Sequence, residues 1–132
     1  MKSLLKVTRK AELGLLLASE LALHPGELVS LEAVSKKTGA SRKFLEEVAG
    51  ELRRAKIVEG LRGAAGGYRL LRDPKALTVA EVLNAVEGPM EIEGCTAHVK
   101  ALRAHVAGPA IIQKVQGQVM ATLMNTTVAD LA

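Results

Sequence analysis

Residues 30–54 read SLEAVSKKTGASRKFLEEVAGELRR, which is two short helical segments separated by a glycine turn. Ser30 is a suitable N-cap for a helix from about Leu31 to Thr38, with Gly39 at the left-handed position that closes it. Ser41 then caps a second amphipathic helix that runs to the end of the stretch. The inner face of this second helix consists of Leu45, Val48, Ala49 and Leu52. Two helices joined by a short turn that contains glycine predict a helix-turn-helix.

A glycine-rich hairpin pattern follows the second helix. The mostly apolar run Lys56–Leu61 precedes RGAAGG at residues 62–67, and the run Tyr68–Leu71 comes after it. Strand, glycine turn and strand predict a β-hairpin, which in this position forms the wing of a winged helix. Arg62 and Arg69 flank the tip, where they could reach phosphate or the minor groove. A nucleotide-binding loop is the rival interpretation, but no Gly-Lys-Ser/Thr sequence follows and no helix begins there.

Helical patterns flank this unit on both sides. Lys10–Leu23 has apolar residues near helical spacing, and Thr78–Val86 opens with the capping box Thr-x-x-Glu. We therefore expect a mainly α fold with a small β-hairpin wing, in which residues 1–89 form the winged helix-turn-helix. Residues 90–108 are expected to form a sensor loop, and residues 109–132 a dimerisation helix and C-terminal tail of the same compact domain. The last helix carries an apolar stripe of Ile111, Ile112, Val115, Val119, Leu123 and Met124. A partner helix is the simplest cover for this stripe, which predicts a homodimer.

Composition narrows the class of protein. The 132 residues suffice for one domain, and 48% apolar with 2% aromatic content predicts an aliphatic, helical core. The single cysteine excludes a disulfide scaffold, and we expect a reducing, cytoplasmic compartment. No window reaches the roughly 20 apolar residues of a membrane span, and charges interrupt the N-terminal apolar stretch, so neither a membrane helix nor a signal peptide is expected.

The positive charge is concentrated in the first part of the chain. Residues 1–73 hold 14 of the 18 Lys and Arg and 9 of the 14 Asp and Glu, a net charge of +5. Residues 74–132 hold the other 4 and 5, a net charge of −1. This asymmetry suggests a polyanion partner for the first part and a protein contact for the second, with a solvated charged surface as the alternative.

These residues and their order resemble the Rrf2 (IscR/NsrR-like) family of bacterial winged-helix regulators. The resemblance extends from about Val7 to the end of the chain. The stretches that carry it are LALH at 21–24, SRKFLE at 41–46, LRRA at 52–55, RGAAGGYRL at 62–70, VEGP at 86–89 and TVADL at 127–131. The resemblance implies homodimeric repressors or activators that place the third helix in the major groove and the wing in the minor groove. It also implies that the long C-terminal helices of two subunits cross to form the dimer.

The candidate DNA-binding residues lie on the third helix, the wing and the first helix. Ser41 has two interpretations, a DNA contact or a helix cap alone, and Lys43 is expected to contact phosphate. Glu46 could accept a hydrogen bond from a cytosine amino group, or it could be a solvated helix charge. The whole candidate set is Lys10, Ser41, Arg42, Lys43, Glu46, Arg62, Gly63 and Arg69.

The chain departs from the family pattern at its cysteines. Many members carry three cysteines that ligate an iron–sulfur cluster, but here only Cys95 is present, and the later two places fall near Ala101 and Val106. One thiolate cannot hold an all-cysteine cluster, so no cofactor is predicted. Three alternatives stay open: Cys95 with His98 and His105 as zinc, copper or mixed-cluster ligands, Cys95 as a thiol switch, or Cys95 as a leftover cysteine.

Together these patterns predict a homodimeric, sequence-specific, DNA-binding transcriptional regulator that acts as a repressor. Its expected partners are a double-stranded DNA operator and a second copy of the chain, with no membrane. The alternatives are a redox or metal sensor regulator that uses Cys95 with His98 and His105, and a winged-helix module for protein contact that does not bind DNA. An enzyme is not expected, because no third group is identified to orient a Cys95–His98 pair.

Overall fold

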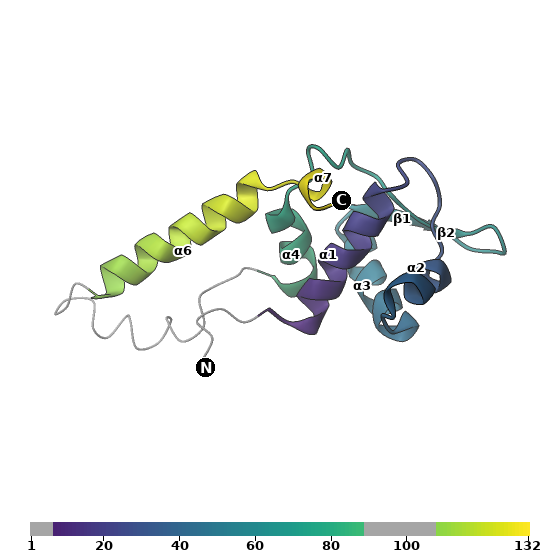
Figure 1. The fold of residues 1–132 in the computed structure, drawn as a ribbon, viewed down its shortest axis with the longest axis horizontal. Coiled ribbons are helices and arrows are strands. Elements are labelled where there is room, and N and C mark those ends of the chain that lie inside the picture. The colour runs from purple at the N-terminus through teal and green to yellow at the C-terminus, as the bar shows by residue number, and fades with distance from the viewer. Residues whose placement is uncertain (1–6, 89–107) are drawn as a thin grey trace.

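The computed structural model describes residues 7–88 and 108–132 (Figure 1). In this part of the chain the fold is mainly α with one two-stranded antiparallel hairpin, which confirms the predicted fold class. The elements are α1 (Arg9–Ala22), α2 (Leu31–Thr38), α3 (Arg42–Arg54), β1 (Val58–Leu61), β2 (Gly67–Leu70), α4 (Val79–Glu87), α6 (Gly108–Asn125) and α7 (Val128–Leu131).

The predicted caps set the ends of the helix-turn-helix. The Ser30 hydroxyl accepts a hydrogen bond from the Ala33 N–H at 3.1 Å at the start of α2, and Gly39 closes that helix with φ = 78°. The Ser41 hydroxyl accepts from the Phe44 N–H at 3.4 Å at the start of α3. Each hydroxyl satisfies an N–H group that the first turn of a helix leaves without an intrahelical partner.

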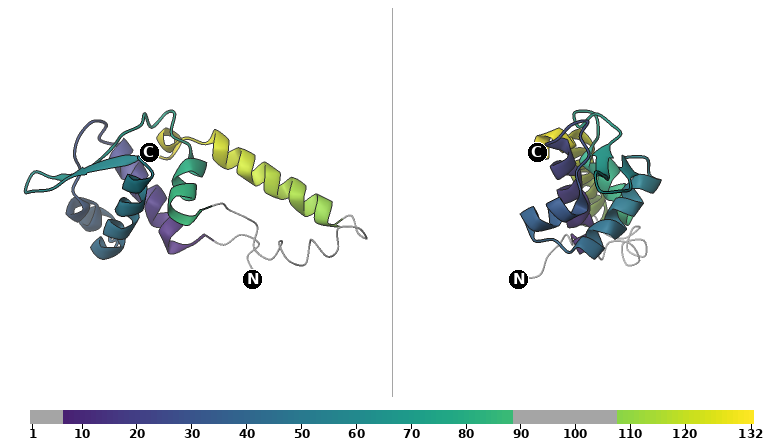
Figure 2. Two further views of the ribbon diagram at one scale, coloured as in Figure 1. Left: turned by 180° about the vertical axis from the view of Figure 1, so that it is seen from behind. Right: turned by 90° about the vertical axis from the view of Figure 1, so that its right-hand side faces the viewer.

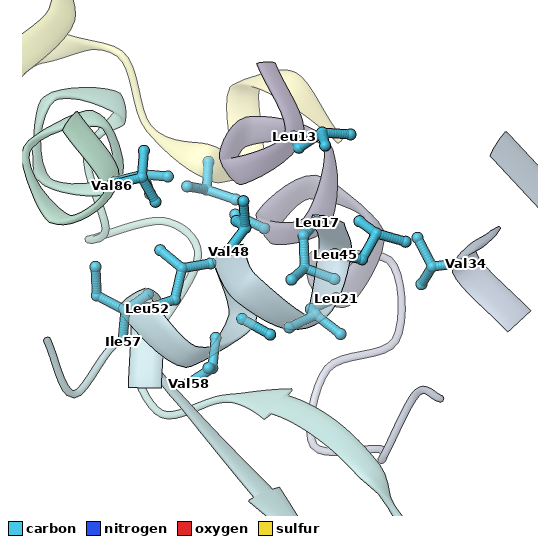
Figure 3. Close-up of a cluster of buried hydrophobic side chains, with 14 of the residues drawn as sticks. Leu13, Leu17, Leu21, Val34, Leu45, Val48, Leu52, Ile57, Val58 and Val86 are labelled. Atoms are coloured by element: carbon cyan, nitrogen blue, oxygen red, sulfur yellow. The ribbon is translucent and has the colours of Figure 1, made fainter. Parts of the chain in front are cut away.

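The core is aliphatic and lies between α1, α3 and α4 (Figure 3). Leu17 of α1 and Leu45, Val48 and Leu52 of α3 have no exposed surface. The apolar face predicted for α3 is therefore the face that packs inward, which leaves its charged face to solvent.

An isolated β-bridge joins the wing to the residue before Ser30, and no local pattern in the sequence predicts it. Within the hairpin, Glu59 pairs with Arg69 and Gly60 with Tyr68. On the other edge of β2, the backbone of Val29 exchanges two hydrogen bonds with Tyr68, both at 2.8 Å. This bridge attaches the wing to the residue that precedes the Ser30 cap, and therefore to the start of α2.

The chain folds back onto the body after α6. Figures 1 and 2 show α6 extending away from the body, while α7 lies against α1. Val128 of α7 is fully buried in the main core cluster, and its N–H donates to the Leu77 carbonyl at 2.8 Å. The tail is thus part of the core of the winged helix. No helix in residues 7–88 and 108–132 combines the length and the apolar character needed to cross a membrane.

Candidate nucleic-acid interface

The start of α3 and the wing line one groove of about 460 Å³. The predicted residues Arg42, Glu46, Arg62 and Gly63 all lie along it. The remaining lining residues are Ser30, Leu31, Leu61, Gly66, Gly67 and Tyr68. The fold therefore brings together two segments about twenty residues apart, each with an arginine, on the two sides of one concave surface.

The first turn of α3 presents a mixed set of charges. The Arg42 guanidinium lies 3.5 Å from the Glu46 carboxylate, one helical turn on, and 3.9 Å from the Glu32 carboxylate of α2. All three side chains are more than half exposed. Exposed ion pairs of this kind contribute at most about 1 kcal/mol to stability. Arg42 and Glu46 can therefore give up their mutual pair when a stronger partner binds. Ser41 and Lys43 are exposed beside them.

The two predicted arginines of the wing differ in their surroundings. Arg62 is exposed at the end of β1, next to Gly63, whose φ of 115° suits glycine. Arg69 lies opposite Glu59 in the hairpin and forms an ion pair and hydrogen bond with it. Since Arg69 already has a carboxylate partner, Arg62 is the wing cation that is better placed to contact an anion.

Lys10 is not among the residues that line the groove. Its Nζ lies 2.5 Å from Oε1 of Glu51 and 3.9 Å from Oε1 of Glu47, both on α3. The hydrogen bond to Glu51 raises the pKa of Lys10 above its ordinary value. The structure therefore places Lys10 between α1 and α3, where it joins the two helices.

Sequence reasoning missed the contribution of Leu61, Tyr68 and the start of α2 to the groove. Leu61 is 55% exposed although it is a large apolar side chain at the end of a strand. Ser30 was identified only as a cap, and the Val29–Tyr68 bridge that brings it beside the wing leaves no mark in the local sequence. The apolar residue Leu61 directly before Arg62 is the one local signal in the sequence.

The candidate sensor residues Cys95, His98 and His105 lie outside the described residues. Within residues 7–88 and 108–132 there is no group of three His, Cys, Asp or Glu side chains that could hold a metal ion.

The comparison with protein families settles the class of protein. Residues 7–132 match the family model of Rrf2, which is described as an iron-dependent transcriptional regulator. The chain belongs to the Rrf2 family. It is a transcriptional regulator of Rrf2 type, as its sequence motifs had indicated.

Curated relatives of this Rrf2 regulator are also named as transcriptional regulators. The HTH-type transcriptional regulator CymR of Bacillus subtilis is 36% identical over 87 residues, which cover 65% of this chain and 63% of CymR, just under two thirds of the relative. The HTH-type transcriptional regulator IscR of Cereibacter sphaeroides is 31% identical over 134 residues, which cover 96% of this chain and 86% of IscR. These names support the prediction that the chain is not an enzyme.

Solved structures agree with the fold of this Rrf2 regulator. The structure of CymR, the global cysteine regulator of B. subtilis, matches with a TM-score of 0.77 at 30% identity and covers 97% of this chain and 96% of that one. The structure of T. potens IscR matches with a TM-score of 0.77 at 30% identity, covering 96% and 85%.

The iron in the family description can be tested against the donors that this chain holds. The chain has one cysteine in 132 residues, and its three histidines are His24, His98 and His105. His24 lies next to the carboxylate of Glu27, at 3.6 Å, in the turn after α1. A single thiolate per chain does not fit an iron–sulfur cluster held by cysteines alone, which needs several thiolates.

Proposed function

We propose that this Rrf2 regulator binds a double-stranded DNA operator as a homodimer, with α3 in the major groove and the wing in the adjacent minor groove. The observation that carries the proposal is the groove of about 460 Å³ between the start of α3 and the wing, with Arg42 and Arg62 along it. An α-helix with its side chains is about 10–12 Å across, which fits a major groove of about 12 Å.

Different residues would serve affinity and specificity. Lys43, exposed in the first turn of α3, would contact phosphate and add affinity without sequence information. Arg42 would donate to guanine, and Glu46 would accept from cytosine, once DNA separates their mutual pair. Arg62 with Gly63 would enter the minor groove. Ser41 would add a phosphate contact while it caps α3.

The proposed dimer rests on apolar surface that α6 exposes. Ile111 and Met124 are each 60% exposed, and Val115 is 43% exposed. A helix that carries several large apolar side chains on open surface is typical of an element that packs against another chain. Residues 109–132 would thus form both the helix that contacts the second subunit and the C-terminal tail. Residues 90–108 would act as the sensor segment between this dimer helix and residues 1–89.

We further propose that the dimer is a repressor without an iron–sulfur cluster, acting in the cytoplasm where it meets chromosomal DNA. A signal would then reach it through Cys95, alone or with His98 and His105. Absorption spectra and metal analysis of protein purified without air test this part: colourless, iron-free protein supports it, and a brown, iron-loaded sample contradicts it.

The experiment that tests the DNA contact is a salt titration of binding to duplexes from the DNA that flanks the protein's own coding region. Lys43→Ala and Arg62→Ala should each weaken binding and lower the slope of log K against log[salt] by about 1, because each removes one cation from the DNA. Lys75→Ala is the matched control, since Lys75 is exposed but does not line the groove.

Two results would contradict the interface. Equal slopes for all three variants would mean that neither Lys43 nor Arg62 is near a phosphate. No sequence-dependent retardation of any duplex would leave the protein-contact alternative as the better account of the winged helix.

A further inference from the structure

We infer that residues 126–131 act as a clasp that fixes the direction of α6 and thereby sets the separation of the two recognition helices. The inference rests on the proposed homodimer. It concerns positioning, because residues 126–131 do not line the groove between α3 and the wing.

The clasp is a short ladder between two segments that each begin a helix. The Val79 N–H donates to the Thr126 carbonyl at 2.8 Å, and the Val128 N–H donates to the Leu77 carbonyl at 2.8 Å. Thr78 and Thr127, the residues between these bonds, form an isolated antiparallel bridge. The two N-caps of α4 and α7 are therefore paired backbone to backbone.

Each of these N-caps also has a complete capping box. In the box of α7, the Thr127 N–H donates to the Asp130 carboxylate at 2.9 Å, and the Asp130 N–H donates to the Thr127 hydroxyl at 3.3 Å. In the box of α4, Thr78 and Glu81 make the corresponding bonds. Below the ladder, Val128 is fully buried, so the clasp has polar restraints at the surface and an apolar anchor in the core.

The attachment at the clasp affects the position of the far end of α6. Near the clasp, Leu123 of α6 packs on the cluster formed by Ala11, Val79 and Leu83, whereas Ile111 near the other end is 60% exposed. Figures 1 and 2 show that α6 extends from its end next to the clasp outward, away from the rest of the fold. Its 18 residues make an arm of about 27 Å at about 1.5 Å per residue.

An arm of this length amplifies small rotations at its base. A tilt of about 10° about the clasp moves the far end of α6 by about 5 Å, given the helical rise. That displacement exceeds the spacing of about 3.4 Å between base pairs along DNA. A clasp that holds α6 in one direction is therefore sufficient to decide which half-site spacing the dimer prefers, and a loosened clasp would allow several.

The test measures the distance between protomers directly. One nitroxide per chain is attached at Lys36→Cys, an exposed position on α2, in a Cys95→Ser background, and distances are measured by double electron–electron resonance without DNA. The clasp variant is Thr127→Ala with Asp130→Ala, which removes both side-chain bonds of the box and leaves Val128 in place. The matched control is Thr122→Ala, whose exposed hydroxyl bonds only within α6, to the Gln118 carbonyl.

The expected result is one narrow distance distribution for the unaltered clasp and the control, and a broad one for the clasp variant. Val128→Ala, which weakens the apolar anchor, should broaden it as well. A narrow, unshifted distribution in both clasp variants, with α-helical circular dichroism retained, would overturn the inference while leaving the dimer in place. Absence of any distance between protomers in the unaltered protein would contradict the proposed dimer itself, and the inference with it.

A second measurement reports on function. Duplexes selected by the unaltered protein are lengthened or shortened by one base pair between half-sites. The unaltered protein should lose affinity for both, and the clasp variant should lose this preference. An undiminished preference in the variant would contradict the inference, because the proposed DNA contacts would still be present.

Discussion

A methyl group at position 67 should detach the wing from α2. In Gly67→Ala, the new Cβ would lie 2.5 Å from the Val29 carbonyl oxygen and 2.6 Å from its carbon. These are backbone atoms, so no side chain can rotate away to relieve the overlap. The overlap can be relieved by separating β2 from Val29, which breaks the two Val29–Tyr68 hydrogen bonds of 2.8 Å. At about 0.5–1.5 kcal/mol for each backbone bond, the expected loss in the free energy of unfolding is about 1–3 kcal/mol.

Urea unfolding at fixed protein concentration, followed by circular dichroism, measures this loss. Gly67→Ala should lower the midpoint with an unchanged m-value. Gly50→Ala in α3 is the control for adding a methyl group, because its nearest neighbour would be the flexible Arg54 guanidinium at 3.6 Å. The control should raise the free energy of unfolding by about 0.5–1 kcal/mol, since glycine inside a helix is unfavourable. A Gly67→Ala protein that unfolds at the same or higher urea concentration than the parent would refute the close approach of Val29 to the wing.

Two further perturbations test local conformations. Lys56 has φ = 61°, a left-handed conformation that costs a residue with a Cβ about 1–2 kcal/mol. Lys56→Gly should therefore raise the free energy of unfolding, measured in urea, by about 1 kcal/mol. A decrease would be inconsistent with this backbone conformation. The hydrogen bond from Arg72 holds the pKa of Glu81 below its ordinary value. The stability from this ionised carboxylate is therefore present above the unfolded pKa of about 4.3 and is lost as the pH falls through the folded value. Both side chains are 39% exposed, so solvent screens the pair and its contribution is small. Arg72→Ala should consequently lose slightly less stability than the parent between pH 7 and pH 3, and an equal or larger loss would contradict the pairing.

The helices and their ends were predictable because their causes are local. Ser30, Gly39 and Ser41 act within four residues of themselves, and each was identified as the cap that the structure shows. The capping box of Thr78 was predicted for the same reason. The apolar face of α3 follows from periodicity alone, and it is the face that is buried.

The features that escaped prediction depend on contacts between distant residues. The Val29–Tyr68 bridge joins residues 39 positions apart and involves only their backbones, so no side-chain pattern announces it. Val128 lies in a helix of four residues, too short for periodicity to reveal a buried face. The ion pair between Lys10 of α1 and Glu51 of α3 joins residues 41 positions apart, so no local pattern predicts it.

Selection from a random pool of double-stranded oligonucleotides by the full-length protein tests the central claim most directly. A dimer with two copies of α3 and the wing should enrich a pseudo-palindrome whose half-sites are about 34 Å apart, or a multiple of that distance. Enrichment of that motif is the result that we expect. A pool that remains random, or one that converges on a single half-site without its inverted copy, would contradict a two-fold regulator that reads DNA through this groove.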